Sequence, residues 1–315
     1  MGNKLIVTAA PHITGPDTTQ KIMQRVCIAL LPTLIASILI FGINSLILTV
    51  ITVAACMFFE WGYCKLVGRE VPVGDFSAAV TGVLLAFNLP ATLPWWMAIV
   101  GAFIAIVIVK QLFGGLGYNV ANPAIVARIA LAMGFASRMA NYPHPANGID
   151  ALASATPLAV SGQMGAADYV TLLLGNHGGV LGETCALTLL LGGLYLIATK
   201  VISPTIPVTY LATVAVLSLV SGRDPIYQLL SGGLMLGAFF MATDYVTSPT
   251  TTKGKIVFGL GLGVITCAIR FLGTMNEGVS FAILLMNLLV PYIEILTRQD
   301  RLGIAKTKKK EGTAK

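Results

Sequence analysis

Hydrophobic positions dominate this 315-residue chain and are interrupted only by short polar gaps. Apolar stretches of about 20 residues recur along the whole length, and each of these is long enough to cross roughly 30 Å of hydrocarbon as a helix. Inside a bilayer, a helix satisfies its own backbone polar groups. The pattern therefore predicts an all-α polytopic membrane protein. The predicted spans cover 22–41, 45–64, 75–89, 95–113, 121–139, 184–200, 205–221, 226–243, 255–272 and 278–297.

Three of these stretches, the third, fifth and eighth, are short or interrupted by glycine and other small residues. We expect broken or tilted helices there, packed inside the bundle. Residues 1–20 hold prolines and glycines and have no apolar run after the single Lys4, so they predict a peripheral arm rather than a cleavable signal peptide.

Composition excludes a soluble protein. Charged residues make up 10% of the chain and hydrophobic residues 56%, whereas soluble domains contain about 25% charged residues. The mean hydropathy is +0.84. The five cysteines are scattered without a CxxC pair or an iron–sulfur pattern, and we expect them to be small packing residues.

The distribution of positive charge predicts an orientation in the membrane. If the N-terminus is inside, segments holding 16 of the 20 Lys and Arg residues are cytoplasmic, as the positive-inside rule requires. Both termini are then cytoplasmic and the loop 140–182 is extracytoplasmic. The net charge of +7 follows from this topology and from the basic tail 299–315. It does not indicate nucleic acid binding; the tail is suited to anionic lipid headgroups or a protein partner.

The loop 140–182 separates two blocks of five spans, 21–139 and 183–298. An odd number of spans in each block would give the blocks opposite orientations, as in inverted-repeat membrane proteins. Sequence support is limited to two sets of matches at slightly different offsets. These are Gly82 and Pro94 with Gly237 and Pro249, and Gly115, Ala124 and Ile125 with Gly273, Ala282 and Ile283.

Glycines within the spans have two interpretations. The runs Gly232-Gly233-x-x-x-Gly237 and Gly259-x-Gly261-x-Gly263 allow close approach of membrane helices, or they leave room for a flat ring. The segment Gly114-Gly115-Leu-Gly117 lacks the strand, helix register and downstream acid of a dinucleotide-binding loop. We therefore do not expect a nucleotide site there.

The segment from Asp150 to Pro157 is a candidate attachment point for a cofactor. Thr156 lies between Ala155 and Pro157, in the longest polar gap of the chain. Its hydroxyl is open to esterification, which would fix a cofactor at the outer surface without a deep pocket. Alternatively, Asp150 or Ser154 simply caps a short helix. The segment itself does not decide between these interpretations.

Acidic residues within or beside the spans are candidates for ion translocation, since burying an acid in hydrocarbon is costly. Asp244 follows Thr243 at the end of a span, and Glu183 opens the sixth span. Oxygens of Asp244 and Thr243 suit Na⁺, although no spacing defines a cation site. Glu60 and Glu294 lie near predicted cytoplasmic ends, where solvation explains them.

Basic residues in the spans have different explanations. Arg128 lies within a span and needs a partner, such as an acid. Lys110 and Arg270 lie near span ends, and we expect them to snorkel to the interface. The three histidines are too dispersed for a metal site and are expected at the surface. They are His12, His144 and His177.

Motifs spread almost end to end resemble one family of membrane redox subunits. This family contains the D subunit of the Rnf complex, a membrane ferredoxin:NAD⁺ oxidoreductase, and the B subunit of the sodium-pumping NADH:quinone reductase. The chain starts almost directly at its first span, which favours the Rnf branch. The motifs are Thr81-Gly-Val-Leu-Leu-Ala-Phe-Asn-Leu-Pro90, Lys110-Gln-Leu-Phe-Gly-Gly-Leu-Gly-Tyr-Asn119 with Asn122-Pro-Ala124, Ser154-Ala-Thr-Pro-Leu-Ala159, Gly182-Glu183, Phe239-Phe-Met-Ala-Thr-Asp244 with Ser248-Pro249, and Gly278-Val-Ser-Phe-Ala-Ile-Leu-Leu-Met-Asn287.

The resemblance implies FMN joined to Thr156 through a phosphoester bond, and it makes a flavin phosphate or ring the alternative partner of Arg128. Ala153 is a departure, since the family often has a second hydroxyl there. The resemblance also implies ten helices in two inverted five-helix halves, and a second, non-covalent flavin such as riboflavin that no motif locates. Its implied partners are other Rnf membrane subunits with an iron–sulfur site, an extracytoplasmic FMN-bearing subunit and a flavin transferase for maturation.

We therefore expect a flavin-bearing electron-transfer subunit in the cell membrane, coupled to Na⁺ or H⁺ transport and not catalytic alone. A flavin on the outer loop would require electrons to cross the membrane and return, because ferredoxin and NAD⁺ are cytoplasmic. The alternatives are a non-redox solute channel or secondary transporter with inverted five-helix repeats, or a scaffold that holds redox partners together.

Overall fold

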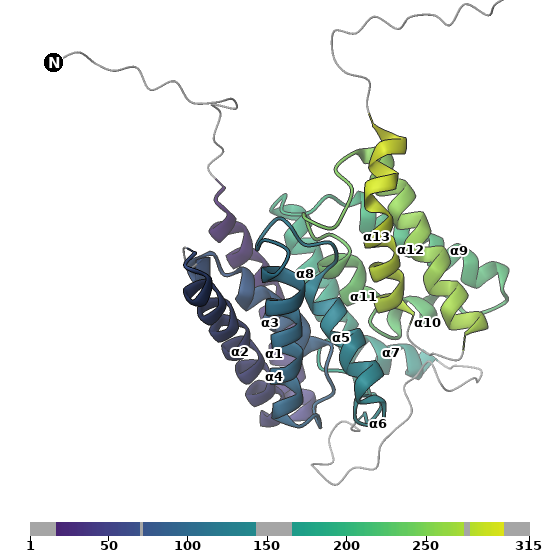
Figure 1. The fold of residues 1–315 in the computed structure, drawn as a ribbon. Helices are drawn as coiled ribbons and strands as arrows, with labels where there is room; N and C mark the ends of the chain where they lie inside the picture. The colour runs from purple at the N-terminus through teal and green to yellow at the C-terminus, as the bar shows by residue number, and fades with distance from the viewer. Residues whose placement is uncertain (1–16, 70–71, 143–165, 274–277, 299–315) are drawn as a thin grey trace, which may run out of the picture.

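The computed structural model describes residues 17–69, 72–142, 166–273 and 278–298, and within these ranges the regular structure is entirely helical (Figure 1). The elements are α1 (Thr19–Phe41), α2 (Ile43–Val67), η1 (Pro72–Asp75), α3 (Ser77–Phe87), α4 (Trp95–Phe103), η2 (Ile104–Gln111), α5 (Pro123–Gly134), α6 (Ala136–Met139), α7 (Ala166–Leu174), α8 (Ala186–Ala198), α9 (Thr205–Val220), α10 (Pro225–Leu230), α11 (Leu234–Leu236), η5 (Gly237–Met241), α12 (Thr252–Leu272) and α13 (Val279–Thr297).

The helices have the length and surface of a membrane protein. Four of them, α1, α2, α12 and α13, are long and apolar enough to cross a bilayer, and shorter apolar helices accompany them. Large aliphatic side chains are exposed on these helices, including Leu39 at 81% and Val264 at 52%. Water disfavours so much exposed apolar surface, whereas lipid tails accept it. The prediction of an all-α polytopic membrane protein agrees with this architecture.

Every predicted span coincides with helical structure, including the three irregular ones. The third span is the 11-residue helix α3. The fifth is interrupted at Phe135, between α5 and α6. The eighth is broken into α10, α11 and η5. Two features were not predicted: the helix α7 lies within the loop 140–182, and η2 and η5 are π-helical.

The helices form two groups that have corresponding internal packing (Figure 1). In the first group α2 packs on α3 and α4, and α5 packs on η2; in the second, α9 packs on η5 and α12, and α13 packs on α12. Among the contacts between the groups are those of α1 with α8 and of α5 with α13.

Glycines permit the closest helix contacts. A Cβ added at Gly192 of α8 would lie 2.3 Å from the carbonyl oxygen of Ala29 on α1. Likewise, a Cβ at Gly259 would lie 1.9 Å from the Thr209 hydroxyl oxygen, and one at Gly263 would lie 2.5 Å from Thr213 Cβ. Close packing, the first interpretation of these glycines, is therefore correct for α8 and α12.

The two ends of the bundle carry different segments. The start of α1 and the end of α13 lie at one end, and the short helices α6 and α7 lie toward the other (Figure 1). The described chain thus enters and leaves the bundle at the same end.

Candidate functional site

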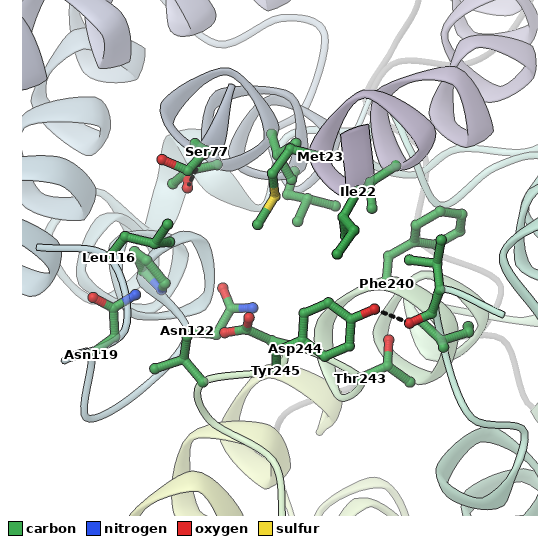
Figure 2. A pocket seen from close by; sticks show the side chains of 18 of the residues that line it. Ile22, Met23, Ser77, Leu116, Asn119, Asn122, Phe240, Thr243, Asp244 and Tyr245 are labelled. Atoms are coloured by element: carbon green, nitrogen blue, oxygen red, sulfur yellow. Dashed lines mark hydrogen bonds between the residues drawn. The ribbon is translucent and has the colours of Figure 1, made fainter. Parts of the chain in front are cut away.

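A pocket with a volume of about 260 Å³ lies where the two groups of helices meet. It is bounded by the first turns of α1, by α3, and by the segments that follow η2 and η5. Figure 2 shows side chains from these segments around one central space. Because α1 begins at the end of the bundle that carries both chain ends, the pocket lies near that end.

The wall of the pocket is mainly apolar. It includes Met23 of α1, Leu84 of α3 and the two consecutive aromatic residues Phe239 and Phe240 of η5. Such walls, with a few polar groups among them, are typical of sites for small organic ligands. Tyr245 closes one side, and its hydroxyl donates a hydrogen bond to the carbonyl oxygen of Val201 (Figure 2).

Two asparagines contribute polar atoms to the pocket. Asn122 caps α5: its side-chain oxygen accepts hydrogen bonds from the backbone N–H groups of Ala124 at 3.1 Å and Ile125 at 3.4 Å. Its amide nitrogen donates to the carbonyl oxygen of Met241 at 3.4 Å, which joins α5 to η5. Asn119 differs, because its Oδ1 is buried and accepts no hydrogen bond within the described residues. A buried acceptor that lines a pocket is suited to a donor on a ligand.

Asp244 also lines the pocket, in the segment after η5. Its Oδ2 accepts a hydrogen bond from the Thr247 hydroxyl at 3.0 Å. The neighbouring Thr243 hydroxyl donates to the carbonyl oxygen of Phe239 in η5 at 2.6 Å, so its proton is already used in a local hydrogen bond. The role of Asp244 in ion translocation stays a prediction, and the pocket gives that carboxylate a route to a ligand.

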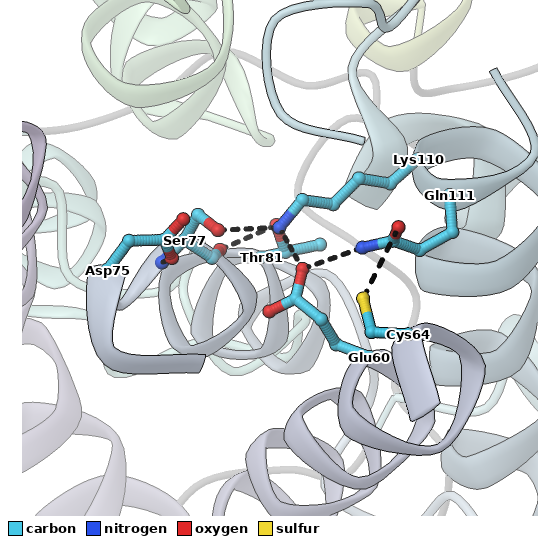
Figure 3. A network of polar contacts seen from close by, with 7 residues as sticks. All are labelled: Glu60, Cys64, Asp75, Ser77, Thr81, Lys110 and Gln111. Atoms are coloured by element: carbon cyan, nitrogen blue, oxygen red, sulfur yellow. Dashed lines mark hydrogen bonds and ion pairs between the residues drawn. The ribbon is translucent and has the colours of Figure 1, made fainter. Parts of the chain in front are cut away.

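A buried ion pair lies at one wall of the pocket. The Nζ of Lys110 is 2.6 Å from the Oε1 of Glu60, and it also donates to the hydroxyl of Ser77 at 2.5 Å. Gln111 donates to the same Glu60 oxygen at 3.0 Å and contacts the Cys64 thiol at 3.9 Å (Figure 3). We call these five residues the Lys110 network.

Two predictions about this network were wrong. Glu60 was expected to be solvated and Lys110 to snorkel, but they are 0% and 1% exposed. The reason is that α2 and η2 are adjacent, so the acid and the base compensate each other inside the protein. A buried pair of this kind is costly to desolvate and costly to break.

The backbone around the network explains its geometry. In η2 the N–H of Leu112 donates to the carbonyl of Val107, five residues earlier, at 3.0 Å, as in a π-helix. Each residue then turns through a smaller angle than in an α-helix, so the consecutive Lys110 and Gln111 reach the same carboxylate. Opposite them, Phe76 has a left-handed φ of 63°. This conformation is costly for a bulky residue and starts α3 at Ser77.

Arg270 also differs from its prediction. It was expected to snorkel, but it is 8% exposed. Its guanidinium donates to the carbonyl oxygen of Gln228 at 2.8 Å and to that of Ser231 at 3.1 Å. These carbonyls lie at the end of α10, where the helix breaks. The arginine therefore satisfies backbone acceptors that the break leaves without helical partners.

The remaining candidates lie apart from the pocket. Glu183 and Arg128 are buried, at 3% and 7% exposure, and neither lines it. His177 is partly buried rather than at the surface, with its Nδ1 3.2 Å from the carbonyl of Gly178. The buried Cys56 and Cys64 share one side of α2, and all five cysteines are free. Outside the described residues lie Asp150, Ser154, Ala155, Thr156, Pro157, His12 and His144.

The pocket and the Lys110 network could not be located from the sequence, although one signal was available. Glu60 and Lys110 occupy similar depths in the second and fourth predicted spans. Opposite charges at one depth in neighbouring helices can pair. This pairing is missed when Glu60 and Lys110 are each interpreted only by their positions near the ends of spans.

Comparisons with known proteins agree on one family. The family model described as NQR2, RnfD, RnfE matches residues 6–303. A relative from Acetobacterium woodii, named as the D subunit of a Na⁺-translocating ferredoxin:NAD⁺ oxidoreductase complex, is 47% identical over 97% of each chain. A relative from Clostridium ljungdahlii, named as the D subunit of a proton-translocating ferredoxin:NAD⁺ oxidoreductase complex, is 38% identical over 96% of this chain and 97% of its own.

A third relative, from Alcanivorax borkumensis, is named as the D subunit of an ion-translocating oxidoreductase complex. It is 36% identical over 95% of this chain and 97% of its own. These matches extend along nearly the full length, from the first helices to the last. With a family model that covers residues 6–303, they show that the chain belongs to the NQR2, RnfD, RnfE family.

Proposed function

We propose that the chain is the flavin-bearing, transmembrane electron-transfer subunit of an ion-translocating ferredoxin:NAD⁺ oxidoreductase complex. The observation that carries this proposal is a Ser-Ala-Thr-Pro segment, 154–157, within a chain whose relatives are named as the D subunits of such complexes. Those names favour a redox role over a solute channel or transporter. The chain would work with other membrane subunits and an extracytoplasmic flavin-bearing subunit, and it would not be catalytic alone.

The proposed topology has ten spans in two inverted five-helix halves, with both termini cytoplasmic and residues 140–182 extracytoplasmic. The corresponding packing of the two helix groups supports it. So does the arrangement of the ends, because α6 and α7 flank residues 143–165 at the end of the bundle opposite the start of α1 (Figure 1). Single cysteines introduced in 143–165 should react with a membrane-impermeant maleimide in intact cells. Reaction only after the cells are opened would refute the orientation.

We propose FMN on the Thr156 hydroxyl, joined by a phosphoester. When the complex is produced with its flavin transferase and run on a denaturing gel, the band of this chain should fluoresce. Thr156→Val should abolish the fluorescence. Thr171→Val, in the same predicted loop, is the matched control and should leave the band bright. A dark wild-type band with an unmodified Thr156 by mass spectrometry would refute the proposal.

We also propose that the pocket binds the second, non-covalent flavin. An isoalloxazine ring, when bound, supplies reversible electron transfer. The apolar wall suits its flat face, and the Oδ1 of Asn119, which has no partner among the described residues, would accept a hydrogen bond from a ring N–H. In complex that has been denatured and precipitated, Asn119→Leu should lower the amount of released flavin several-fold. The covalent flavin on Thr156 stays with the pellet and serves as the internal control; equal release would refute this site.

We propose that ion coupling involves Asp244, which lines the pocket, and the buried Glu183. Relatives of this chain are named for both Na⁺ and proton translocation, so uptake of both ions has to be measured. In complex reconstituted into vesicles, Asp244→Asn should reduce ion uptake per electron transferred. Unchanged coupling would remove Asp244 from the pathway without affecting the proposed electron-transfer role.

A further inference from the structure

Lys110 occupies a position between a buried acid and the pocket. Its ammonium contacts Glu60 and Ser77 on one side, and the same residue lines the pocket on the other. It is also almost fully buried, at 1% exposure. The charge of Lys110 is therefore shared between a fixed carboxylate and whatever occupies the pocket.

The acid that shares this lysine is incompletely satisfied. Both the Lys110 ammonium and the Gln111 amide donate to the Oε1 of Glu60. The Oε2 of Glu60 is buried and has no hydrogen-bond partner within the described residues. The carboxylate therefore holds the lysine through one oxygen only. It partly cancels the positive potential that the lysine projects into the pocket.

We propose that Lys110 is a positioning residue that stabilises negative charge on a redox ring in the pocket. The negative charge of Glu60 weakens this stabilisation and thereby sets its strength. This inference rests on the proposed function, namely the second flavin. One electron, supplied by a reduced iron–sulfur centre of the complex, adds one negative charge to the ring. Lys110 keeps its proton throughout, and no bond forms or breaks.

The sign of each effect follows from electrostatics in a buried site. Charges interact strongly where water is excluded, so a cation beside the ring favours the reduced state and raises its reduction potential. Glu60→Gln removes the opposing charge and keeps a hydrogen-bond acceptor for Lys110. That variant should raise the potential. Removal of the lysine charge should lower it.

The test compares Glu60→Gln with the double variant Glu60→Gln, Lys110→Met. Both lack the acid, so neither leaves a buried carboxylate without its cation, and they differ only in the lysine. The double variant leaves no buried charge in the network, so its comparison with wild type serves as the second measurement if Glu60→Gln alone folds poorly. The complex is produced without flavin transferase, so that the covalent flavin is absent and the proposed non-covalent flavin is titrated spectroelectrochemically. We expect the reduction potential of the ring to be at least about 59 mV lower in the double variant than in Glu60→Gln. For a one-electron couple, this shift corresponds to a tenfold weaker preference for the reduced ring.

Lys65→Met is the matched control. Lys65 is exposed on α2 and lies 4.9 Å over the Trp61 ring, away from the pocket lining, and this variant makes the same change of charge. The inference is overturned if control and double variant shift equally, or if the double variant does not shift. The proposed flavin site is tested separately, by flavin release from Asn119→Leu. If wild-type complex holds no non-covalent flavin, the second-flavin proposal and this inference both fail.

Discussion

Breaking the Glu60–Lys110 pair should destabilise the protein strongly, and removing both charges should restore much of that stability. Lys110→Met leaves a carboxylate that is 0% exposed without its cation. Glu60→Gln leaves a buried ammonium without a counter-charge, with only neutral acceptors beside it: the new amide oxygen and the Ser77 hydroxyl at 2.5 Å. The double variant leaves no buried charge in the network.

The expected sizes follow from the geometry of the pair. Removal of one partner from a buried ion pair costs about 3–5 kcal/mol, because the other charge stays buried. Replacement of the whole pair by neutral side chains of similar volume is often close to neutral. The two single losses should therefore sum to several kcal/mol more than the loss in the double variant. The coupling between the two positions should be at least about 2 kcal/mol, as contacting residues show.

Thermal unfolding of the detergent-solubilised complex, followed through a fluorescent label on this chain, gives the three shifts relative to wild type. The variants Lys65→Met and Glu294→Gln repeat the same chemical changes outside the network and should shift the midpoint little. The reasoning is refuted if the two single effects add up to the double effect within about 0.5 kcal/mol, the range typical of independent sites.

Three further predictions concern packing, backbone capping and thiol access. Gly192→Ala would place a Cβ 2.3 Å from a backbone oxygen of α1 and should cost about 1–3 kcal/mol in thermal unfolding; Gly62→Ala, whose Cβ meets nothing within 4 Å, should not. Arg270→Met should lower the free energy of unfolding by about 1.5–3 kcal/mol for each charged hydrogen bond lost. Arg223→Met removes only a cation–π contact with a phenylalanine ring at 4.4 Å, and it should lower that free energy by about 0.5–1 kcal/mol. Cys56, at 0% exposure, should react with maleimide only after denaturation; prompt labelling of the native complex would contradict its buried position.

The course of the helices could be predicted from the sequence because hydropathy is a local property. A span needs a long apolar run, and even the broken eighth span was indicated by Gly232, Gly233 and Gly237. The π-helical segments could not be predicted in this way. Ile104–Gln111 is a continuous apolar run with a polar end, and its extra residue per turn depends on packing against α2 and α5.

The candidate site was predicted only in part, because it depends on contacts between distant segments. Asp244 was singled out as a membrane acid, and it does line the pocket. Asn119 and Lys110 both belong to a motif noted in the sequence. No local pattern indicates that the Oδ1 of Asn119 is buried without a partner among the described residues, or that Lys110 pairs with an acid 50 positions away. Charge pairs of this kind depend on which helices are neighbours, and the spans alone do not determine that.

The π-helical form of η2 makes this segment sensitive to chain length. A π-turn holds one residue more than an α-turn, so deletion of a single residue between Ile104 and Val109 would let the segment relax into ordinary α-helix. Because the deletion removes the additional residue that the π-turn holds, the side chains beyond it would keep nearly the same direction relative to α2. Insertion of one residue has no such relief, and it would turn Lys110 away from Glu60 while the apolar character of the segment stayed the same. A one-residue insertion here should therefore disrupt the protein more than a one-residue deletion.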